Sequence, residues 1–356
     1  MITQTRYLVN LSTLVDTYQI QAKTEGKSLN TIRIYSTALT IFERFLERQG
    51  YSTAVTEIGP PEIREFIGYL QDTRAFMEHP FTGPQSRGLT GHTINCYLRS
   101  LRAFWSWLVS EELIESNPFD KVIVPKAPKN IITPFTEDQI RLMLSAIDTK
   151  TPVGFRDWAI ILVLLDTGIR VSEMTDLRLG QINLAQRSLK VLGKGNKERE
   201  VPIGISVQRA IAKYINKYRP TPVLPVSDNL FLTREGFPLT ANRVQTIIET
   251  RARLANIQGV RASPHTFRHT FAITYLRNGG DVFTLQRILG HETLDMVRNY
   301  VYLAQSDLQE AHLRCSPVDN MRYQVKKPPT TQSLPVNDIK HTHLEKSKKP
   351  NIKLRR

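Results

Sequence analysis

A proline- and lysine-rich segment divides this chain into two stretches with different residue patterns. The segment "NPFDKVIVPKAPKN" (117–130) holds three prolines and three lysines and shows no helical period. Proline cannot continue a helix or donate to a strand ladder, so such a segment is typical of a linker. Since 356 residues suffice for two ordinary domains, the pattern predicts a first domain at 1–116, a linker at 117–133, a second domain at 134–315 and a tail at 316–356.

The first stretch has the periodicity of amphipathic helices. In "SLNTIRIYSTALTIFERFLERQG", apolar residues recur largely on one helical face, and the pattern stops at Gly50. The segments "EIREFIGYLQD" and "TINCYLRSLRAFWSWLVSEELI" continue the pattern, and a loop with two prolines and two glycines (74–88) lies between them. We expect a bundle of about four helices. Four of its basic residues are candidates for phosphate contacts, although on a bundle such residues are more often merely solvated: Lys27, Arg33, Arg99 and Arg102.

The second stretch mixes helical patterns with one hairpin. Thr136 and Gln139 form a capping box, and an apolar helix (155–167) and a short helix after Arg170 follow. In "SLKVLGKGNKEREVPI", alternating residues flank a Gly-Lys-Gly-Asn turn, which is a hairpin signal. The expected fold class is mainly α with a small β-hairpin sheet, in which a helical N-terminal domain precedes a mixed α/β domain.

The chain is strongly basic. Its formal net charge is +15 and its pI is near 9.8, which indicates a polyanionic partner. Ten Lys/Arg and three Asp/Glu lie in the tail, so just over half of the excess belongs to residues 1–315. The tail is poor in apolar residues, and we expect it to be disordered.

Cysteine usage and hydropathy indicate an intracellular protein. Cys96 and Cys315 are far apart and outside any metal-type spacing, which suits a reducing compartment. The N-terminus lacks the apolar core of a signal peptide, and the longest strongly apolar run, "WAIILVLL" (158–165), is too short to span a bilayer. We therefore expect a soluble, cytoplasmic protein with no membrane partner.

The stretch "SPHTFRHTF" (263–271) gathers imidazole and guanidinium groups at the predicted start of a helix. Ser263 can cap the free amides, and Pro264 suits the first helical position because no N–H is needed there. His265 and Arg268 lie roughly 60° apart around such a helix. They turn away from a stripe that we expect to be buried, formed by Phe267, Phe271, Thr274 and Tyr275. Since the start of a helix also favours an anion, we interpret the stretch as an anion site.

Five segments of the second stretch hold side chains that together suit one reaction: "DTGIRVSEMTDL", "GKGNKER", "HTFRH", "LGHE" and "RNYVYL". Breaking a phosphodiester without a metal ion requires a nucleophile, neutralisation of the charge on the non-bridging oxygens, and a proton for the departing oxygen. Two arginines can clamp the phosphate, a lysine or histidine can donate the proton, and a tyrosine hydroxyl can attack. Each segment alone has a structural explanation, such as a surface ion pair between Arg170 and Glu173. Together they favour phosphodiester chemistry without a metal or another cofactor.

In this order, the segments resemble the tyrosine recombinase (phage integrase) family, most closely its Xer-type and integrative-element members, over roughly residues 10–313. "TGIRVSE" resembles the first catalytic arginine motif, "GKGNKER" the hairpin lysine, "HTFRH" the His-x-x-Arg box and "LGHE" the second histidine. Tyr300, nine residues beyond His291, is similar to the nucleophile. The resemblance implies a site-specific DNA recombinase. Such an enzyme cuts and rejoins strands through a covalent 3′-phosphotyrosyl intermediate and a Holliday junction, without metal or ATP.

The resemblance also assigns roles to the matching residues. Arg170 and Arg268 would bind the scissile phosphate, and Lys194 would donate a proton to the leaving 5′ oxygen. His265 would hydrogen-bond the phosphate and help to move the tyrosine proton, and His291 would hydrogen-bond a non-bridging oxygen. Tyr300 would be the nucleophile, and Glu173 would support the site without reacting.

Partners follow from the same resemblance. The helical first domain resembles the family's core-binding (SAM-like) domain, which forms a C-shaped clamp around duplex DNA together with the catalytic domain. Lys197 in the hairpin is a further candidate for DNA contact. Family members act as homotetramers on two DNA sites, in some cases with a related recombinase, and exchange a C-terminal helix, expected here within residues 306–314. A nucleoid-associated location in the cytoplasm is the corresponding expectation.

Three features depart from the family pattern. Tyr302 stands two residues beyond Tyr300, where Xer-type members often have a histidine, so a second hydroxyl is near the nucleophile. The loop at 74–88 is longer than the family's compact version, and the tail beyond residue 316 has no family counterpart. A substitution has to decide between the two tyrosines.

Three other functions fit parts of the sequence. A metal hydrolase would use the pair His265 and His269, but the glutamate of a His-Glu-x-x-His motif is missing. A DNA-binding regulator without catalysis would explain the charge but not the order of the five segments. A type IB topoisomerase shares the tyrosine chemistry but acts as a monomer. The DNA sequence recognised stays open, as does the biological role: integration or excision of a mobile element, transposition, or chromosome-dimer resolution.

Overall fold

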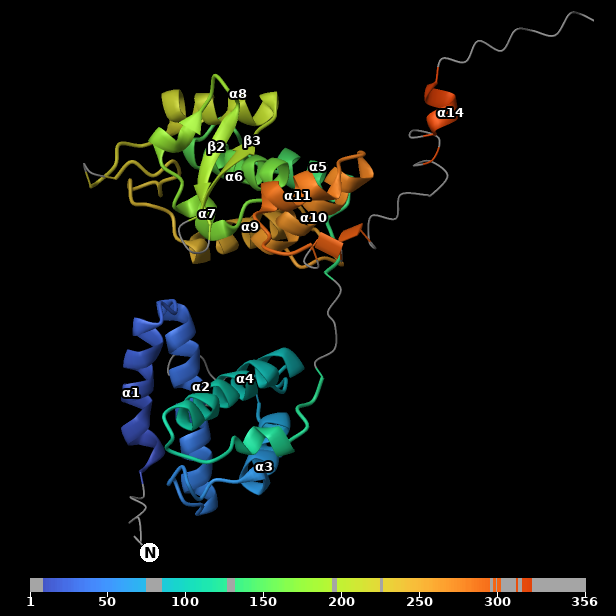
Figure 1. Ribbon diagram of the computed structural model, residues 1–356. Helices are drawn as coiled ribbons and strands as arrows, with labels where there is room; N and C mark the ends of the chain where they lie inside the picture. Colours follow the sequence, from blue (N-terminus) through green and yellow to red (C-terminus); the bar gives the residue numbers. More distant parts are fainter. Residues whose placement is uncertain are drawn as a thin grey trace, which may run out of the picture. The chain divides into compact units, whose positions relative to one another are not determined.

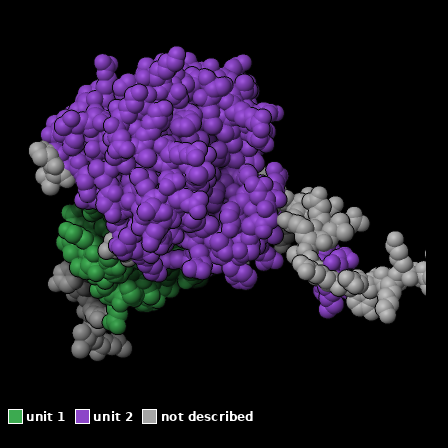
Figure 2. Space-filling view, turned by 90° about the horizontal axis from the view of Figure 1, so that it is seen from above, with its two compact units in different colours: residues 1–131 green, residues 132–356 purple. Residues whose placement is uncertain are grey.

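The computed structural model describes residues 9–74, 85–126, 132–193, 197–224, 227–294, 297–298, 300–301, 312 and 316–321. The chain divides into two compact units, residues 1–131 and 132–356, which Figure 2 colours separately. Each unit has its own buried apolar cluster, so each is described by itself.

The first unit is the predicted bundle of four helices (Figure 1). They are α1 (Leu11–Thr24), α2 (Leu29–Gln49), α3 (Pro60–Asp72) and α4 (Gly91–Ser110). Ser28 caps α2 by accepting a hydrogen bond from the Thr31 amide. The same helix ends at Gly50, whose φ of 74° is a left-handed conformation that glycine adopts without strain.

Large aromatic side chains fill the core of this bundle. The rings of Phe42 and Phe66 meet edge-to-face at 4.8 Å, and Trp105 packs on Phe42 at 5.6 Å. A 3₁₀ helix, η1 (Pro118–Lys121), adds Phe119, which is fully buried. Residues 118–121 therefore pack with the first unit, although they fall in the predicted linker 117–133. A 3₁₀ helix of four residues makes little more than one turn, which is too short to show a helical pattern in the sequence.

The second unit combines eight further α-helices among the described residues with one small sheet, and seven of these helices precede residue 290. These seven are α5 (Glu137–Ser145), α6 (Pro152–Thr167), α7 (Val171–Thr175), α8 (Ile205–Lys213), α9 (Ala241–Leu254), α10 (Pro264–Arg277) and α11 (Val282–Leu289). The short helix α14 (Pro317–Asn320) lies in the region predicted as a tail. The strands are β1 (Ile182–Asn183), β2 (Ser188–Leu192) and β3 (Glu198–Pro202), which form an antiparallel sheet in the order β1-β2-β3. The predicted hairpin is confirmed, with Leu189 opposite Val201, and so is the capping box of Thr136 and Gln139.

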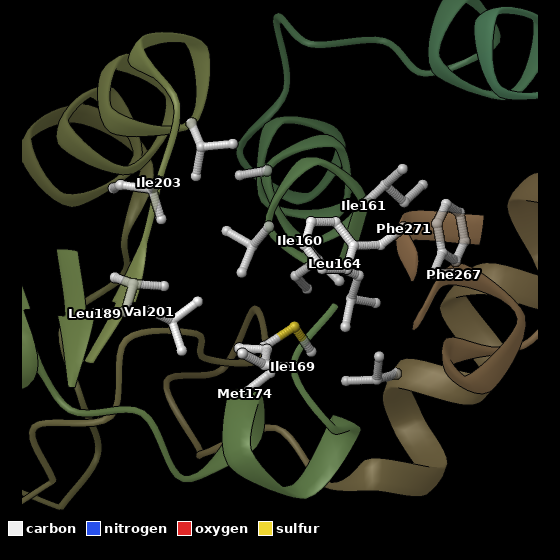
Figure 3. Packing of buried hydrophobic residues seen from close by; sticks show 14 of the residues in the cluster. Ile160, Ile161, Leu164, Ile169, Met174, Leu189, Val201, Ile203, Phe267 and Phe271 are labelled. Atoms are coloured by element: carbon white, nitrogen blue, oxygen red, sulfur yellow. The ribbon is translucent and has the colours of Figure 1, made fainter. Parts of the chain in front are cut away.

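Helix α10 lies in the interior of this unit. Figure 3 shows Ile160, Ile161 and Leu164 of α6 in the same buried cluster as Phe267 and Phe271 of α10. Gly168 ends α6 with φ at 59°, and a Cβ there would lie 2.3 Å from the Phe271 ring. This tight approach fixes the chain just before Arg170.

The predicted single buried stripe on α10 is wrong in part. Phe267 and Phe271 are buried, but Thr274 is exposed and Tyr275 only half-buried. Arg268 and His269, on other sides of the helix, are buried instead. The reason is that α10 packs against α6, α9 and α11, so its neighbours cover it on several sides rather than on one face.

A buried ion triad joins α6 to α9. The Asp157 carboxylate accepts hydrogen bonds from Arg156 at 2.7 and 3.0 Å and from Arg251 at 2.6 and 3.0 Å. Arg156 also donates to the Leu232 carbonyl at 3.1 Å. Asp157 is 3% exposed, so the carboxylate depends on these partners for its solvation.

We expect Asp157→Ala to lower the free energy of unfolding of the second unit by about 3–5 kcal/mol, because it leaves Arg156 and Arg251 without their counter-charge. Urea unfolding of the full chain measures the loss. The matched control is Arg141→Ala, which breaks the exposed Glu137–Arg141 pair on α5 and is expected to cost about 0.5 kcal/mol or less. Equal losses in the two variants would contradict a structural role for the triad.

Candidate active site

Three arginines from distant parts of the chain converge beside one buried carboxylate. Glu173 of α7 accepts hydrogen bonds from Arg199 of β3 on both oxygens, each at 2.8 Å. It also accepts from the backbone amide and Nη1 of Arg170, again at 2.8 Å. Burial alone would raise the pKa of Glu173, but the hydrogen bonds from Arg199 and Arg170 outweigh it and hold the pKa below its usual range. Glu173 is therefore ionised and orients both guanidinium groups.

Arg268 is the most deeply buried of the three arginines. It is 4% exposed and donates to the carbonyls of Gly168 and Leu289, both at 2.8 Å. Burial, and the positive charge of Arg170 next to it, lower the pKa of Arg268 to about 10. The group still carries its charge at neutral pH, and no carboxylate shares a hydrogen bond with it among the described residues.

His291 completes this cluster from the end of α11. Gly290, with φ at 63°, ends the helix, and the next residue turns its ring toward Arg268, whose Nη2 lies 2.6 Å from Nε2 of His291. Burial and the positive charges of Arg268, Arg170 and Arg199 lower the pKa of His291 to about 4. The imidazole is therefore neutral, and since a guanidinium can only donate, Nε2 is its acceptor.

Tyr300 is buried next to this cluster, with an exposed fraction of 6%. Its ring centroid lies 4.9 Å from that of His269 and 6.2 Å from that of His291. Burial raises the pKa of Tyr300, whereas the charges of Arg268 and Arg170 and a hydrogen bond from Arg268 act in the opposite direction. Burial outweighs these contributions, so the pKa of Tyr300 lies above its ordinary value and the free enzyme holds a neutral phenol beside the Arg268 guanidinium.

Other predicted site residues have less central positions. His265 lies exposed in the first turn of α10, where partial desolvation and the charges of Arg268 and Arg261 lower its pKa. Lys194 and Tyr302 lie outside the described residues, so their roles stay predictions. Lys197 is exposed, 3.9 Å from the carboxylate of Glu292.

Three of the four basic residues predicted to contact DNA from the first unit have protein partners. Arg102 donates to the Phe119 carbonyl at 2.8 Å, Arg99 donates to the Asn95 carbonyl at 3.2 Å, and Lys27 lies 3.5 Å from Glu25. Arg33 and Arg99 are exposed. Contact of these residues with DNA stays a prediction.

Sequence reasoning missed two members of the site, Arg199 and His269. Arg199 lies two residues before the buried Val201 on the same face of β3, and a charged residue on the inward face of a strand was a usable signal. His269 is 7% exposed and follows Arg268 directly, but its placement beside Tyr300 depends on the packing of a segment far along the chain.

Within the described part of the chain, no group of three or more His, Cys, Asp or Glu side chains is arranged to hold a metal ion. No helix in the same residues is both long and apolar enough to cross a bilayer.

Known protein families match most of this chain. The phage integrase family matches residues 134–307, and the phage integrase SAM-like domain matches residues 11–124. The tyrosine recombinase XerC of Oceanobacillus iheyensis is 31% identical over 314 residues, which cover 87% of this chain and 96% of that protein. The tyrosine recombinase XerD of Listeria monocytogenes is 28% identical over 294 residues, covering 82% of this chain and 94% of that protein.

Solved structures show the same fold. The integrase of transposon Tn1549 in complex with transposon right-end DNA is 22% identical and covers 87% of this chain and 99% of its own, with a TM-score of 0.68. The XerH recombinase bound to its difH substrate is 19% identical and covers 86% of this chain and 85% of its own, with a TM-score of 0.62. The fold of this chain is therefore that of these integrase and recombinase structures. The chain belongs to the phage integrase family and is a tyrosine recombinase of the Xer/integrase type.

We expect the ring of His291 to titrate near pH 4 in the folded protein, well below its ordinary value of 6.5. Since the unfolded chain takes up this proton at about pH 6.5 and the folded chain only near pH 4, acidification across that window favours unfolding. Histidine NMR spectra recorded against pH measure the midpoint, and His291→Gln identifies the resonance by its loss. A midpoint near 6.5 would contradict the described surroundings of the ring.

Proposed function

We propose that this enzyme performs site-specific recombination with the described cluster as its catalytic site and Tyr300 as its nucleophile. The observation that carries the proposal is the convergence of Arg170, Arg268, His291 and Tyr300, which come from four separate segments. Folding alone has no need of a phenol and two guanidinium groups at one buried point, because such groups are costly to desolvate.

The charge of the cluster suits a phosphodiester. Arg170, Arg199 and Arg268 face the single carboxylate of Glu173, and His291 is neutral, so the site holds an excess of positive charge. A scissile phosphate carries one negative charge, and a second develops as the phosphorus becomes five-coordinate. Fixed cations in a partly dry site stabilise that developing charge strongly.

The residues act in the following sequence. Arg170 and Arg268 bind the non-bridging oxygens, with Glu173 and Arg199 holding Arg170 in place. The Tyr300 oxygen attacks phosphorus, and the bond from phosphorus to the 5′ oxygen breaks. Lys194 gives the departing oxygen its proton. The product is a 3′-phosphotyrosyl link and a free 5′-hydroxyl, and because the ester is retained, a 5′-hydroxyl of another strand reverses the step without ATP.

The partner that suits this site is double-stranded DNA carrying a specific recombination site. The support is the net charge of +15 and the DNA bound to the Tn1549 integrase and XerH structures. We further propose that the two units clamp the duplex, and that a homotetramer, in some settings with a related recombinase, joins two sites through a Holliday junction. The element moved or resolved by this activity is not specified by the site, since the phosphate chemistry is the same in each case.

We expect a covalent protein–DNA adduct when the full chain is incubated with nicked suicide duplexes from its own genomic flanks. A denaturing gel detects the adduct, which should form in the presence of EDTA because the arginines supply the positive charge. Tyr300→Phe should abolish it, a loss of about 10³-fold or more.

Tyr302→Phe is the matched control, because it removes the neighbouring hydroxyl and leaves Tyr300 in place. It should retain the adduct. An adduct that survives in Tyr300→Phe and vanishes in Tyr302→Phe would assign the nucleophile to the other tyrosine.

A further inference from the structure

Two histidines lie against the ring of Tyr300, and only one of them can accept a proton. Nε2 of His291 accepts from Arg268, so in the neutral ring Nδ1 carries the hydrogen. That Nδ1 is buried and has no hydrogen-bond partner, which makes it a free donor and not an acceptor. His291 can therefore bind a phosphate oxygen but cannot take the tyrosine proton while Arg268 stays in place.

His269 has the opposite tautomer. Its ring is 7% exposed and is hydrogen-bonded to the backbone carbonyl of Ile132, while Nε2 is buried without a partner. Since a carbonyl only accepts, the bonded nitrogen is Nδ1 with its hydrogen, and Nε2 presents a lone pair. A buried polar atom without a partner destabilises the folded protein, so an unpartnered Nε2 beside Tyr300 calls for a functional reason.

The phenol of Tyr300 needs such an acceptor. Arg268 can only donate to the phenol oxygen, so the phenol's own hydrogen has to leave by another route when the oxygen attacks phosphorus. Among the described residues, the ring contacts of Tyr300 are with His269 at 4.9 Å and His291 at 6.2 Å. His265, the family's usual imidazole in this motif, is exposed one helical turn away from His269.

We propose that Nε2 of His269 accepts the proton of Tyr300 as the tyrosine attacks the scissile phosphate, and returns it when the strand is rejoined. The proposal rests on the proposed function of the site. In the forward step the oxygen–phosphorus bond forms, the bond to the 5′ oxygen breaks, and the phenol proton passes to His269, which becomes an imidazolium. Rejoining reverses each of these changes, so no further reactant is needed.

The surroundings of His269 suit a base that is neutral in the free enzyme and charged only during the reaction. Burial and the nearby His265 lower the pKa of His269, whereas the Ile132 carbonyl acts in the opposite direction by accepting from the ring. The dianionic phosphate of the transition state adds to the stabilisation of the imidazolium. A contact that is loose in the free enzyme can shorten once DNA is bound.

The variant His269→Asn tests the proposal, because the asparagine amide can still donate to the Ile132 carbonyl but has no basic nitrogen. Single-turnover cleavage of the suicide duplex is measured from about pH 6 to about pH 9. The other titratable or charged groups that face His269 and Tyr300 are Arg170, Arg268, His265 and His291. At neutral pH the variant should be about 100-fold slower than the unaltered enzyme. This deficit should shrink steadily as the pH rises, because hydroxide then removes the phenol proton.

His265→Asn is the matched control on the same helix. The family resemblance places His265 at the phosphate and the tyrosine proton, whereas the present proposal leaves it only the phosphate, so its deficit should not change with pH over this range. DNA affinity and thermal stability are measured for both variants, and His269→Gln replaces His269→Asn if the latter does not fold. A His269 deficit that is independent of pH, or no deficit, would overturn the proposal. In either case the loss of the adduct in Tyr300→Phe would stand, so the two proposals fail separately.

Discussion

Four hydrogen bonds meet on the buried carboxylate of Glu173, and the rest of the site depends on them. Arg199 supplies two of these bonds and also donates to the Ile288 carbonyl at 2.7 Å, near the end of α11. One acidic residue thus joins the start of α7, the strand β3 and the turn that carries His291. Without it, the neighbouring arginines would repel one another in a partly dry space, where the repulsion is stronger than in water.

Local chemistry made much of this fold predictable. A few neighbouring residues determine each of these features: the caps at Thr136 and Ser263, the left-handed glycines after α2 and α11, and the hairpin of β2 and β3. The membership of Arg170, Glu173, Arg268, His291 and Tyr300 in one site was also predictable, because their motifs resemble those of one family. The burial of α10 was not, since a buried helix covered on several sides has no single apolar stripe.

The missing parts of the prediction share one cause. Arg199 and His269 owe their roles to groups more than 25 residues away in the sequence, namely Glu173 and Tyr300. Phe119 likewise joins the first core from a segment whose prolines and lysines indicate a linker. The hydrogen-bond roles of the histidines could not be predicted from the sequence either, because the partners of each ring determine its tautomer. These partners are the Ile132 carbonyl for His269 and the Arg268 guanidinium for His291.

In the proposed reaction, fixed guanidinium groups neutralise one DNA phosphate while a phenol attacks it. Cleavage of a duplex whose scissile phosphate is replaced by an uncharged methylphosphonate tests this claim most directly, because it removes the charge that the arginines are said to neutralise. Arg268→Ala should cleave the normal phosphate far more slowly than the unaltered enzyme does. On the methylphosphonate, this rate deficit of the variant should be smaller by about 10-fold or more. An equal impairment on both substrates would show that Arg268 serves the fold and not the charge of the reacting phosphate.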